Sequence, residues 1–446
     1  MIQEPPLVTE PHHWLMGGAA YYAQRDPLKW LPEWADQYGD VYRIGSRIGS
    51  AVVVADPDLA RQVLTEKYKS YLEKGRSYIV LRILMGNGLV TSSGEFWRGQ
   101  RKLTQPAFHR RRLDAIFAMM VERSGAYAER LLERAEAIDV APMFSQLTLE
   151  IISRAMFSTD VESEATEVSR HITTLNEAAL RMLRQPWRFF LPRKFPTPFT
   201  ATEFKARTEM DRIVHGIIER RRSGEDTHDD LLGMFLSACD EETGRGMTNE
   251  QLRDEVMTIF VAGHETTANA MCWVLHLVAT HPEAAGKLYG EIDAAGDALD
   301  RGDLGAFTYT RQVIEESLRL FPTIWSVGRT CVEDDELGGF HIRSGTNLLI
   351  PIFHFHKSER WWDEPEKFDP DRFQSDRRPA PGIYFPFGAG PRTCIGNHFA
   401  MQELIIMTAS ILKRLRVLPQ PGFDVQPDAL ITLRPKHGMM LRFEER

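Results

Sequence analysis

A helical pattern of apolar residues runs through residues 96 to 286, and this long segment constrains the fold more than any other feature of the chain. The pattern is interrupted at Pro106, at Pro142, in QPWRFFLPRKFPTPFT (185–200) and in SGEDTHDD (223–230), where proline or clustered polar residues are expected to end helices. The chain has 446 residues, of which 43% are hydrophobic, so it is long enough to bury a substantial core. We therefore expect a mainly α fold.

Strand patterns are confined to short stretches near the two ends of this helical segment. YGDVYRI (38–44) and AVVVAD (51–56) predict a hairpin, and PDLARQVLTEK predicts a helix directly after it. ELGGFHIRSGTNLLI (336–350) reads as further short strands. We expect one large domain over residues 1–446, with β-rich parts at about 38–60 and 336–380 and a helical core elsewhere, because no linker or internal repeat marks a boundary.

Composition excludes several classes of protein. No run approaches the roughly 18 to 20 apolar residues that span a bilayer. The opening MIQEPPLVTEPHHW lacks the charged and then apolar segments of a signal peptide. These two features predict a soluble cytoplasmic protein without a transmembrane anchor. The net charge of -8 disfavours nucleic acid as a partner. The four cysteines lie tens of residues apart without a CxxC pair, which disfavours a zinc knuckle or a disulfide framework.

One cysteine lies in an unusual loop, FPFGAGPRTCIG (385–396). A cysteine thiolate can serve as a nucleophile, a redox thiol or a metal ligand, and the glycines around Cys394 favour ligation because they let the main chain approach a flat cofactor closely. Gly396 then opens a helix whose dipole favours an anionic sulfur. The alternative is a small buried cysteine with no chemical role.

The spacing of this loop resembles the haem-binding signature of the cytochrome P-450 family, in which the cysteine thiolate holds the haem iron. The resemblance implies that Cys394 is the axial ligand and that the loop contributes to binding of the cofactor, with Phe387 beside the sulfur and Arg392 near an anionic cofactor group. The residues that match are Phe387, Gly388, Gly390, Arg392, Cys394 and Gly396.

An apolar helix earlier in the chain carries a polar cluster, in TIFVAGHETTANAMCWVL (258–275). Ala262, Gly263, Glu265 and Thr266 match the oxygen-activation motif of the family. The resemblance implies that Gly263 clears space over the cofactor, that Thr266 donates a hydrogen bond to dioxygen and that Glu265 is a relay acid. On the residues alone, threonines bonded back to their own helix are the alternative.

Two further matches are structural or concern the haem propionates. Glu316 and Arg319, three residues apart on one helical face, resemble the Glu-x-x-Arg motif, and Arg372 in FDPDRF completes the expected structural network. Taken alone, the first pair is more typical of a solvated surface ion pair than of a functional site. The propionate partners that the resemblance implies are Trp97, Arg101 and Arg329. A core indole and two surface arginines are the alternatives.

The resemblance covers nearly the whole chain, and it implies a single-domain, mainly α monooxygenase of a soluble bacterial type. Such an enzyme uses haem b and O2, inserts one oxygen atom into a C–H bond or double bond of a lipophilic substrate, and takes electrons from NAD(P)H through separate redox partners. A peroxide-driven haem oxygenase, an isomerase, and a haem-thiolate sensor without turnover are the competing readings. We expect the enzyme to be monomeric.

No flavin or nucleotide motif is present, so a separate ferredoxin or flavodoxin is expected to supply electrons. A basic segment predicts its docking site, although a solvated helix face is the alternative; the residues are Arg98, Arg101, Lys102, Arg110, Arg111 and Arg112.

The positions that line the substrate pocket in the family are apolar here, which indicates a fatty acid, terpenoid or steroid-like substrate. They are Ile79, Leu84, Met85, Leu180, Met182, Phe260, Ile324, Trp325 and Val327. The loop WRFFLPRKFP (187–196) is a candidate membrane contact, and its alternative is a loop folded onto its own domain.

Overall fold

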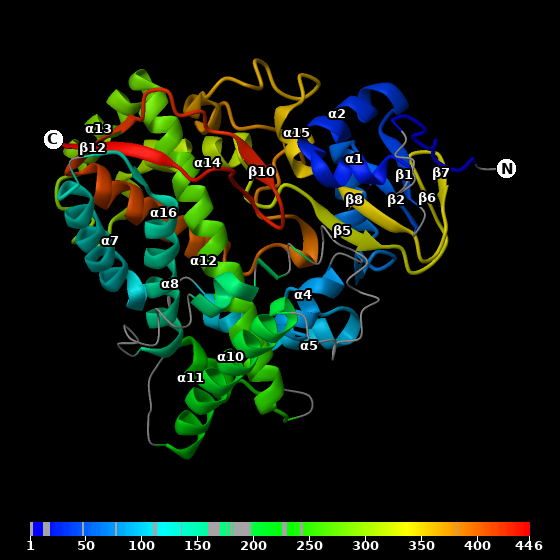
Figure 1. The fold of residues 1–446 in the computed structure, drawn as a ribbon, viewed down its shortest axis with the longest axis horizontal. Helices are drawn as coiled ribbons and strands as arrows, with labels where there is room; N and C mark the ends of the chain where they lie inside the picture. Colours follow the sequence, from blue (N-terminus) through cyan, green and yellow to red (C-terminus); the bar gives the residue numbers. More distant parts are fainter. Residues whose placement is uncertain are drawn as a thin grey trace.

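The computed structural model describes residues 3–446 except 12–17, 47–48, 76–77, 110–113, 135, 159–169, 176, 179–180, 182–197, 225–229, 241–243 and 381. Within this part, most of the chain is helical, and the largest sheet lies at one end of the molecule (right in Figure 1). The prediction of a mainly α fold with small sheets is confirmed.

The described helices follow the chain order of the predicted segments. Their bounds are α1 Ala20–Arg25, α2 Pro27–Tyr38, α3 Pro57–Arg61, α4 Tyr78–Met85, α5 Gly94–Thr104, α7 Phe117–Leu132, α8 Ala141–Phe157, α10 Pro198–Ser223, α11 Leu231–Ser237, α12 Asn249–Thr280, α13 Pro282–Ala295, α14 Thr308–Leu320, α15 Ile352–Lys357 and α16 Asn397–Leu412.

The described strands form four small sheets. Their bounds are β1 Val41–Ser46, β2 Gly49–Val54, β3 Glu73–Lys74, β4 Ile138–Asp139, β5 Val327–Thr330, β6 Asp335–Leu337, β7 Phe340–Ile342, β8 Asn347–Ile350, β9 Leu415–Pro419, β10 Pro427–Ala429, β11 Leu433–Pro435 and β12 Met440–Glu445. The sheets have the orders β1-β2-β8-β5-β3, β4-β12-β9, β6-β7 and β10-β11.

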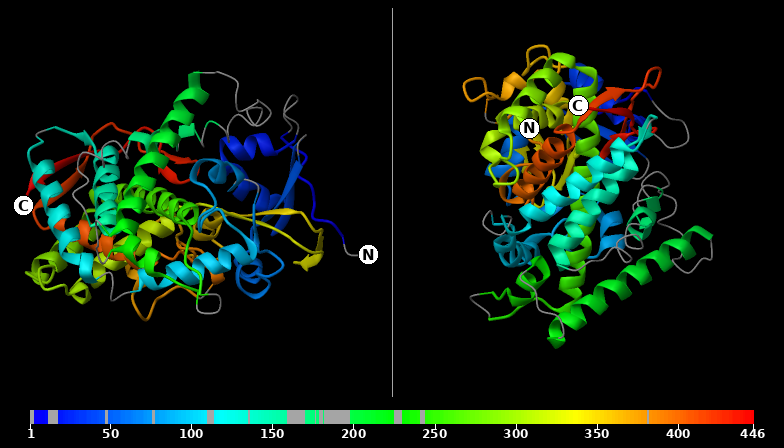
Figure 2. Two further views of the ribbon diagram at one scale, coloured as in Figure 1. Left: turned by 90° about the horizontal axis from the view of Figure 1, so that it is seen from below. Right: turned by 90° about the vertical axis from the view of Figure 1, so that its left-hand side faces the viewer.

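Helix α12 runs through the middle of the helical part (green in Figure 1), and α8, α14 and α16 pack against it. It begins in a capping box, in which the Thr248 hydroxyl accepts from the Gln251 amide and the Gln251 side chain accepts from the Thr248 amide. Pro282 starts the next helix and so marks the end of α12. Helix α10 lies across one end of α12 (Figure 2).

The largest sheet is buried on both faces, as the alternation of its strand residues requires. In β2, Val52 and Val54 pack into one apolar cluster with residues of β8, and Val53 packs into another with the helices α1 and α2. Strands β1 and β2 pair as the predicted hairpin, with Val41 opposite Val54. The crossover strand β8 adds to β2 in parallel.

Some boundaries differ from the expectations. Within the expected β-rich part 336–380, strands end at Ile350, and helix α15 follows. Pro142 lies in the first turn of α8 instead of between two helices, because a proline there needs no amide partner. The end of α10 at Ser223 and the start of α11 at Leu231 agree with the predicted break at 223–230.

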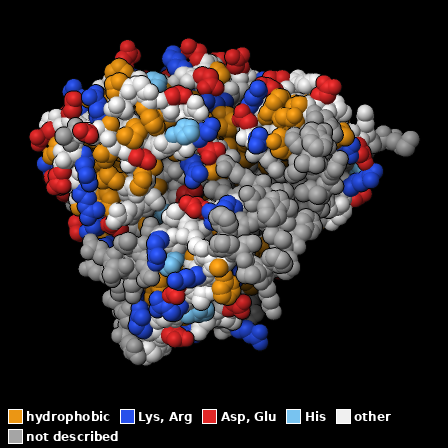
Figure 3. Space-filling view, in the orientation of Figure 1, with side chains coloured by type: hydrophobic (Ala, Val, Ile, Leu, Met, Phe, Trp, Pro, Cys, Tyr) orange, Lys and Arg blue, Asp and Glu red, His pale blue; other side chains and the backbone are white. Residues whose placement is uncertain are grey.

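The outer surface carries charges of both signs, which are interspersed among apolar side chains on the face shown in Figure 3. No helix among the described residues is long and apolar enough to cross a membrane.

Candidate active site

The loop before α16 holds Cys394 through main-chain bonds. The Cys394 amide donates to the Phe387 carbonyl at 2.9 Å, and the Thr393 amide and hydroxyl donate to the Gly390 carbonyl at 3.0 and 2.7 Å. These bonds close the turn that ends at Cys394, three residues before α16 begins at Asn397. The Gly396 amide donates to the sulfur, which favours a thiolate.

Glycine is required in this loop for two separate reasons. Gly388 and Gly390 have φ angles of 71° and 68°, in the left-handed region that favours glycine. At Gly390 a side chain would also overlap the Leu64 carbonyl, in the π-helical segment Gln62–Glu66 that follows α3. The loop can therefore lie against this segment only with glycine at residue 390.

The Cys394 side chain is exposed, yet desolvation by the surrounding protein raises the pKa of its thiol. The Gly396 amide and the Arg101 guanidinium partly offset this effect. Arg101 Nη1 also donates to the Thr393 carbonyl at 3.0 Å, so this guanidinium supports the cysteine loop.

Arg392 and Trp97 form a stacked pair beside the same loop. The guanidinium carbon lies 3.9 Å from the centroid of the indole, and the two guanidinium nitrogens donate to the carbonyls of Ser92 and Leu72 at 2.9 and 3.1 Å. The remaining nitrogen, Nε, is buried without a partner in the described chain. Burial, with a contribution from the nearby Arg329, lowers the pKa of Arg392 to about 9.

Lys74 joins the buried Arg329 and the half-buried Arg392 in a basic cluster; the part of Lys74 in it was not predicted from the sequence. Lys74 and Arg329 are register partners on β3 and β5, so their side chains leave the same face of the sheet. Burial lowers the pKa of both, and repulsion from Arg329 and then Arg392 lowers the pKa of Lys74 further. Among the described residues no carboxylate forms an ion pair with any of the three; the Lys74 ammonium lies over the Tyr78 ring. Such a cluster calls for an anionic partner.

The three residues of the expected structural network do come together. Glu316 and Arg319 are fully buried and form two hydrogen bonds, at 2.7 and 2.8 Å. Arg372 Nε lies 3.5 Å from the Glu316 carboxylate and its Nη2 donates to the Glu364 carbonyl. Because a buried charge is costly unless it is paired and hydrogen-bonded, the surface-pair alternative is wrong for Glu316 and Arg319.

A buried histidine connects this network to the cysteine loop. Arg319 Nη1 donates to the His356 carbonyl at 2.7 Å, and the Phe385 amide donates to His356 Nε2 at 2.9 Å. Burial and the adjacent Arg319 lower the pKa of His356 to about 3, so the imidazole is neutral and its nitrogen can accept. Sequence reasoning missed His356, since no pattern links FHFHK to a loop 29 residues later.

The polar cluster of α12 lies in a stretch of the helix interior, residues 261–266, that is mostly half-buried. The side chains of Thr266 and Thr267 donate to the carbonyls of Ala262 and Gly263, at 2.6 and 3.1 Å. This is the back-bonded arrangement named as the alternative, and such bonds also loosen a helix locally. A Cβ at Gly263 would meet Ile152 of α8, so this glycine permits close packing of the two helices.

Glu265 and His264 leave α12 in different directions. His264 is buried, its Nδ1 donates to the Phe260 carbonyl, and burial lowers the pKa of its imidazole. Glu265 accepts a hydrogen bond from the Thr432 hydroxyl at 2.7 Å. Thr432 belongs to the turn between β10 and β11 and was not predicted.

A second buried carboxyl, Glu403 of α16, lies near Thr267. Burial raises the pKa of Glu403 well above its usual range, and Thr267 partly offsets this effect. Burial therefore favours the neutral form of this carboxyl. A glutamate in the middle of the apolar run FAMQELIIMTA is the signal that could have identified it.

The predicted pocket residues are dispersed between core and surface. Met85 and Phe260 are buried, and Phe260 packs on Phe157 with centroids 5.3 Å apart. Ile79 is 52% exposed. Trp325 donates from Nε1 to the Leu430 carbonyl and so holds the β10–β11 turn.

The other pocket candidates are less informative. Ile324 and Val327 are partly buried. Leu180, Met182 and the side chain of Leu84 lie outside the described residues, as does the loop 187–196.

The basic segment is partly neutralised within the chain. Arg98 pairs with Glu95 on the same helix, and Lys102 pairs with Asp240 at 3.2 Å. Residues 110–112 lie outside the described part.

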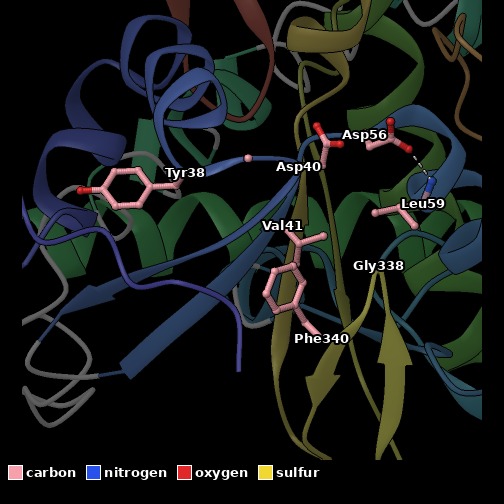
Figure 4. Close-up of a pocket in the computed structure, with 8 residues that line it drawn as sticks. Tyr38, Asp40, Val41, Asp56, Leu59, Gly338 and Phe340 are labelled. Carbon is pink, nitrogen blue, oxygen red and sulfur yellow. Dashed lines mark hydrogen bonds between the residues drawn. The ribbon is translucent and has the colours of Figure 1, made fainter. Parts of the chain in front are cut away.

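A separate surface hollow lies by the β6–β7 hairpin (Figure 4). It is lined by Tyr38, Gly39, Asp40, Val41, Asp56, Leu59, Gly338 and Phe340. No predicted site residue lines it, and we assign it no role in the chemistry.

Comparison with known proteins identifies the family. The family model for cytochrome P-450 matches residues 5–442. The chain belongs to the cytochrome P-450 family. Cyclooctat-9-en-7-ol 5-monooxygenase of Streptomyces melanosporofaciens is 34% identical, over 89% of this chain and 86% of the relative. Pentalenene oxygenase of Streptomyces avermitilis is 33% identical, over 96% and 95%.

The fold agrees with this assignment. A crystal structure of a cytochrome P-450 has a TM-score of 0.85 and 25% identity, and the match covers 100% of this chain and 99% of that one. This P-450 is a monooxygenase of a lipophilic substrate, and it uses haem, O2 and electrons from a redox partner.

The residues present fit a haem. Cys394 offers an accessible sulfur with an amide directed at it, and the unpaired cluster of Lys74, Arg329 and Arg392 fits the two carboxylates of the porphyrin. In the described chain no group of three or more His, Cys, Asp or Glu is arranged to hold a metal ion by itself. A single thiolate therefore fits an iron whose other ligands come from a macrocycle.

Proposed function

We propose that this P-450 inserts one oxygen atom of O2 into a C–H bond or double bond of a cyclic terpenoid. Two relatives that cover most of the chain are named for the oxygenation of cyclooctat-9-en-7-ol and of pentalenene, both of them terpenoids. The observation that carries the proposal is the cysteine loop, whose accessible sulfur is backed by the buried Glu316–Arg319 network through His356.

Haem b is the proposed cofactor, with Cys394 as its axial ligand. Haem with a thiolate ligand supplies the activation of O2 and the cleavage of its O–O bond. Arg329 would hold one propionate. Arg392, which its stack on Trp97 keeps in place, would attract the second propionate by its charge and donate a hydrogen bond to it from Nε. Arg101 supports the Cys394 loop in this proposal, since its hydrogen bond goes to the Thr393 carbonyl.

The loop assignment is tested by the absorption spectrum of the reduced, carbon monoxide-bound protein. Wild type should give the strongly red-shifted Soret band that a thiolate ligand produces. Cys394→Ser should lose that band, whereas Cys239→Ser, at an exposed thiol outside the site, should keep it. A red-shifted band in Cys394→Ser would contradict the assignment.

Proton delivery is assigned to Thr266 and Glu265. The Thr266 hydroxyl donates to the Ala262 carbonyl, so it must turn away from its own helix to donate to the reacting oxygen. Thr266→Ala should raise the peroxide released per electron consumed and lower the product. Thr280→Ala, which removes a comparable bond to the His276 carbonyl at the end of α12, should leave this ratio unchanged. Equal ratios in wild type and Thr266→Ala would contradict the role.

Electrons are proposed to come from NAD(P)H through a ferredoxin or flavodoxin that docks at α5. Arg101 of this helix contacts the Cys394 loop, so a partner bound here lies close to the thiolate. Lys102→Glu should slow reduction by an acidic ferredoxin, and the effect should shrink at high salt. Lys436→Glu, at an exposed lysine after β11, is the control. The docking site is wrong if both variants are reduced at the wild-type rate.

Peroxide-driven oxygenation, the alternative that the sequence left open, makes a different prediction. It predicts product from hydrogen peroxide without redox partners, and no product from NAD(P)H and partners. The Glu265–Thr266 pair favours the O2-dependent reaction because it provides a relay for protons.

We propose a cytoplasmic location. All four cysteines are free, which fits a reducing compartment and one that holds NAD(P)H-dependent partners.

A further inference from the structure

The turn between β10 and β11 touches α12 at its polar cluster. Thr432, 4% exposed, donates from Oγ1 to Glu265 Oε1 at 2.7 Å and accepts from Asn269 Nδ2 at 3.2 Å. Glu265 and Asn269 are four residues apart, so they lie on one face of α12, and the Thr432 hydroxyl lies between them.

The chemistry of these three groups fixes the direction of both bonds. An amide nitrogen can only donate, so it takes a lone pair of the hydroxyl. The single proton of Thr432 is then left for the Glu265 carboxylate, which accepts it. A hydrogen bond to a charged group is stronger than a neutral one.

The turn that carries Thr432 is held independently of Glu265. Trp325 Nε1 donates to the Leu430 carbonyl at 2.8 Å, Trp273 Nε1 donates to the Leu433 carbonyl at 3.2 Å, and the Leu433 amide donates to the Thr323 carbonyl at 2.8 Å. These bonds lie on both sides of Thr432. The hydroxyl is therefore presented to α12 by a fixed frame.

We propose that Thr432 is a positioning residue for proton delivery, which holds the Glu265 carboxylate in the orientation from which it relays protons. Asn269 orients the Thr432 hydroxyl in turn. The inference rests on the proposed function of Glu265, because positioning has a consequence only if this carboxylate carries protons.

The decisive variant is Thr432→Val, which keeps the shape of the side chain and removes the hydroxyl. The ratio of peroxide to product should rise about fivefold, the factor that corresponds to roughly 1 kcal/mol for one such bond. Thr432→Ser should restore most of the coupling. The red-shifted Soret band should stay as in wild type, since the thiolate loop is not changed.

A matched control is available elsewhere in the fold. Thr310 is also buried and donates from Oγ1 to Glu291 Oε2 at 2.7 Å, at the contact of α14 with α13. Thr310→Val removes an equivalent threonine–carboxylate bond outside the proposed site. It should leave the peroxide ratio unchanged.

A double-mutant cycle with Glu265→Gln separates positioning from a purely structural role. If Thr432 acts through Glu265, Thr432→Val should add no further loss of coupling when Glu265 is already glutamine. Equal losses on both backgrounds, an unchanged ratio in Thr432→Val, or a serine variant as uncoupled as the valine variant would each overturn the inference. If Thr432→Val does not fold, Asn269→Ala is the alternative variant, because it frees the Thr432 hydroxyl to rotate. Asn269→Ala should give a smaller rise in the ratio of peroxide to product. This rise should be absent when Glu265 is already glutamine.

The proposed function fails in a different way. Without the red-shifted Soret band in wild type, or without uncoupling in Glu265→Gln, the assigned roles of Cys394 or Glu265 are wrong, whatever Thr432→Val does.

Discussion

Replacing Glu255 by glutamine should make the stability of this P-450 less dependent on pH. Glu255 is a buried residue of α12, 1% exposed, and it accepts a hydrogen bond from the Leu89 amide at 3.0 Å. Burial, together with the neighbouring Asp254 carboxylate, raises the pKa of Glu255 from 4.5 to about 7, although the Leu89 amide partly offsets the rise. Glutamine keeps an oxygen that can accept from Leu89 and does not titrate.

The sign and size of the effect follow from linkage. Because the folded-state pKa lies above the unfolded-state value, the favourable contribution is fully present below about pH 4.5 and is lost as the pH rises to about 7. The shift from 4.5 to about 7 corresponds, at about 1.36 kcal/mol per pKa unit, to a loss of roughly 3 kcal/mol. Of this loss of stability, about 2 kcal/mol is expected to fall between pH 5.5 and pH 8.

Urea unfolding of the haem-loaded protein at these two pH values measures the effect. The free energy of unfolding of Glu255→Gln minus that of wild type should be larger at pH 8 by about 2 kcal/mol. Glu250→Gln, at an exposed carboxylate in the first turn of α12, serves as the control for replacing a glutamate of this helix. A difference for Glu255→Gln that is equal at pH 5.5 and pH 8 would refute the reasoning.

The remaining predictions concern the support of the site. Gly390→Ala should prevent haem retention, because its methyl would overlap the Leu64 carbonyl. Gly224→Ala, also at positive φ but with open space around it, should cost only about 1 kcal/mol of stability. Gel filtration followed by the haem-to-protein absorbance ratio compares the two variants. Arg319→Lys keeps the charge but loses hydrogen bonds to Glu316 and to three carbonyls. We expect the free energy of unfolding, measured in urea, to fall by about 3 to 5 kcal/mol. A fall of less than about 1 kcal/mol would contradict the network. Glu403→Gln should raise the free energy of unfolding at pH 7 and leave it unchanged near pH 4. The raised pKa of this carboxyl lowers stability only at pH values where the carboxyl of the unfolded chain has released its proton. Equal effects at both pH values would show that Glu403 is not desolvated.

Sequence patterns succeeded where the deciding interactions are local. The helical period predicted the course from α5 to α13, and the glycines at 388 and 390 indicated a loop with positive φ angles, as the structure has it. Glu316 and Arg319 are three residues apart, so their bond could be expected, but that they are fully buried could not.

Some residues make contacts that no local pattern could have indicated. A side chain at Gly263 would meet Ile152 of α8, which lies 111 residues earlier in the chain. The indole nitrogen of Trp325 anchors the β10–β11 turn through Leu430, 105 residues later. The roles predicted for these two residues, clearance over the cofactor and lining of the pocket, stay predictions.

The sequence by itself determined the helical class, the conformation that the cysteine loop must adopt and the family to which the chain belongs, because each depends on residues adjacent in the chain. Only the tertiary structure decided which charges share a buried site and which side chains orient the proposed relay. Lys74 meets Arg329 across a strand pair, and Thr432 meets Glu265 across 167 residues. Such contacts arise when distant segments pack together, and burial then gives a lysine or a threonine an energetic weight that the same residue lacks on the surface.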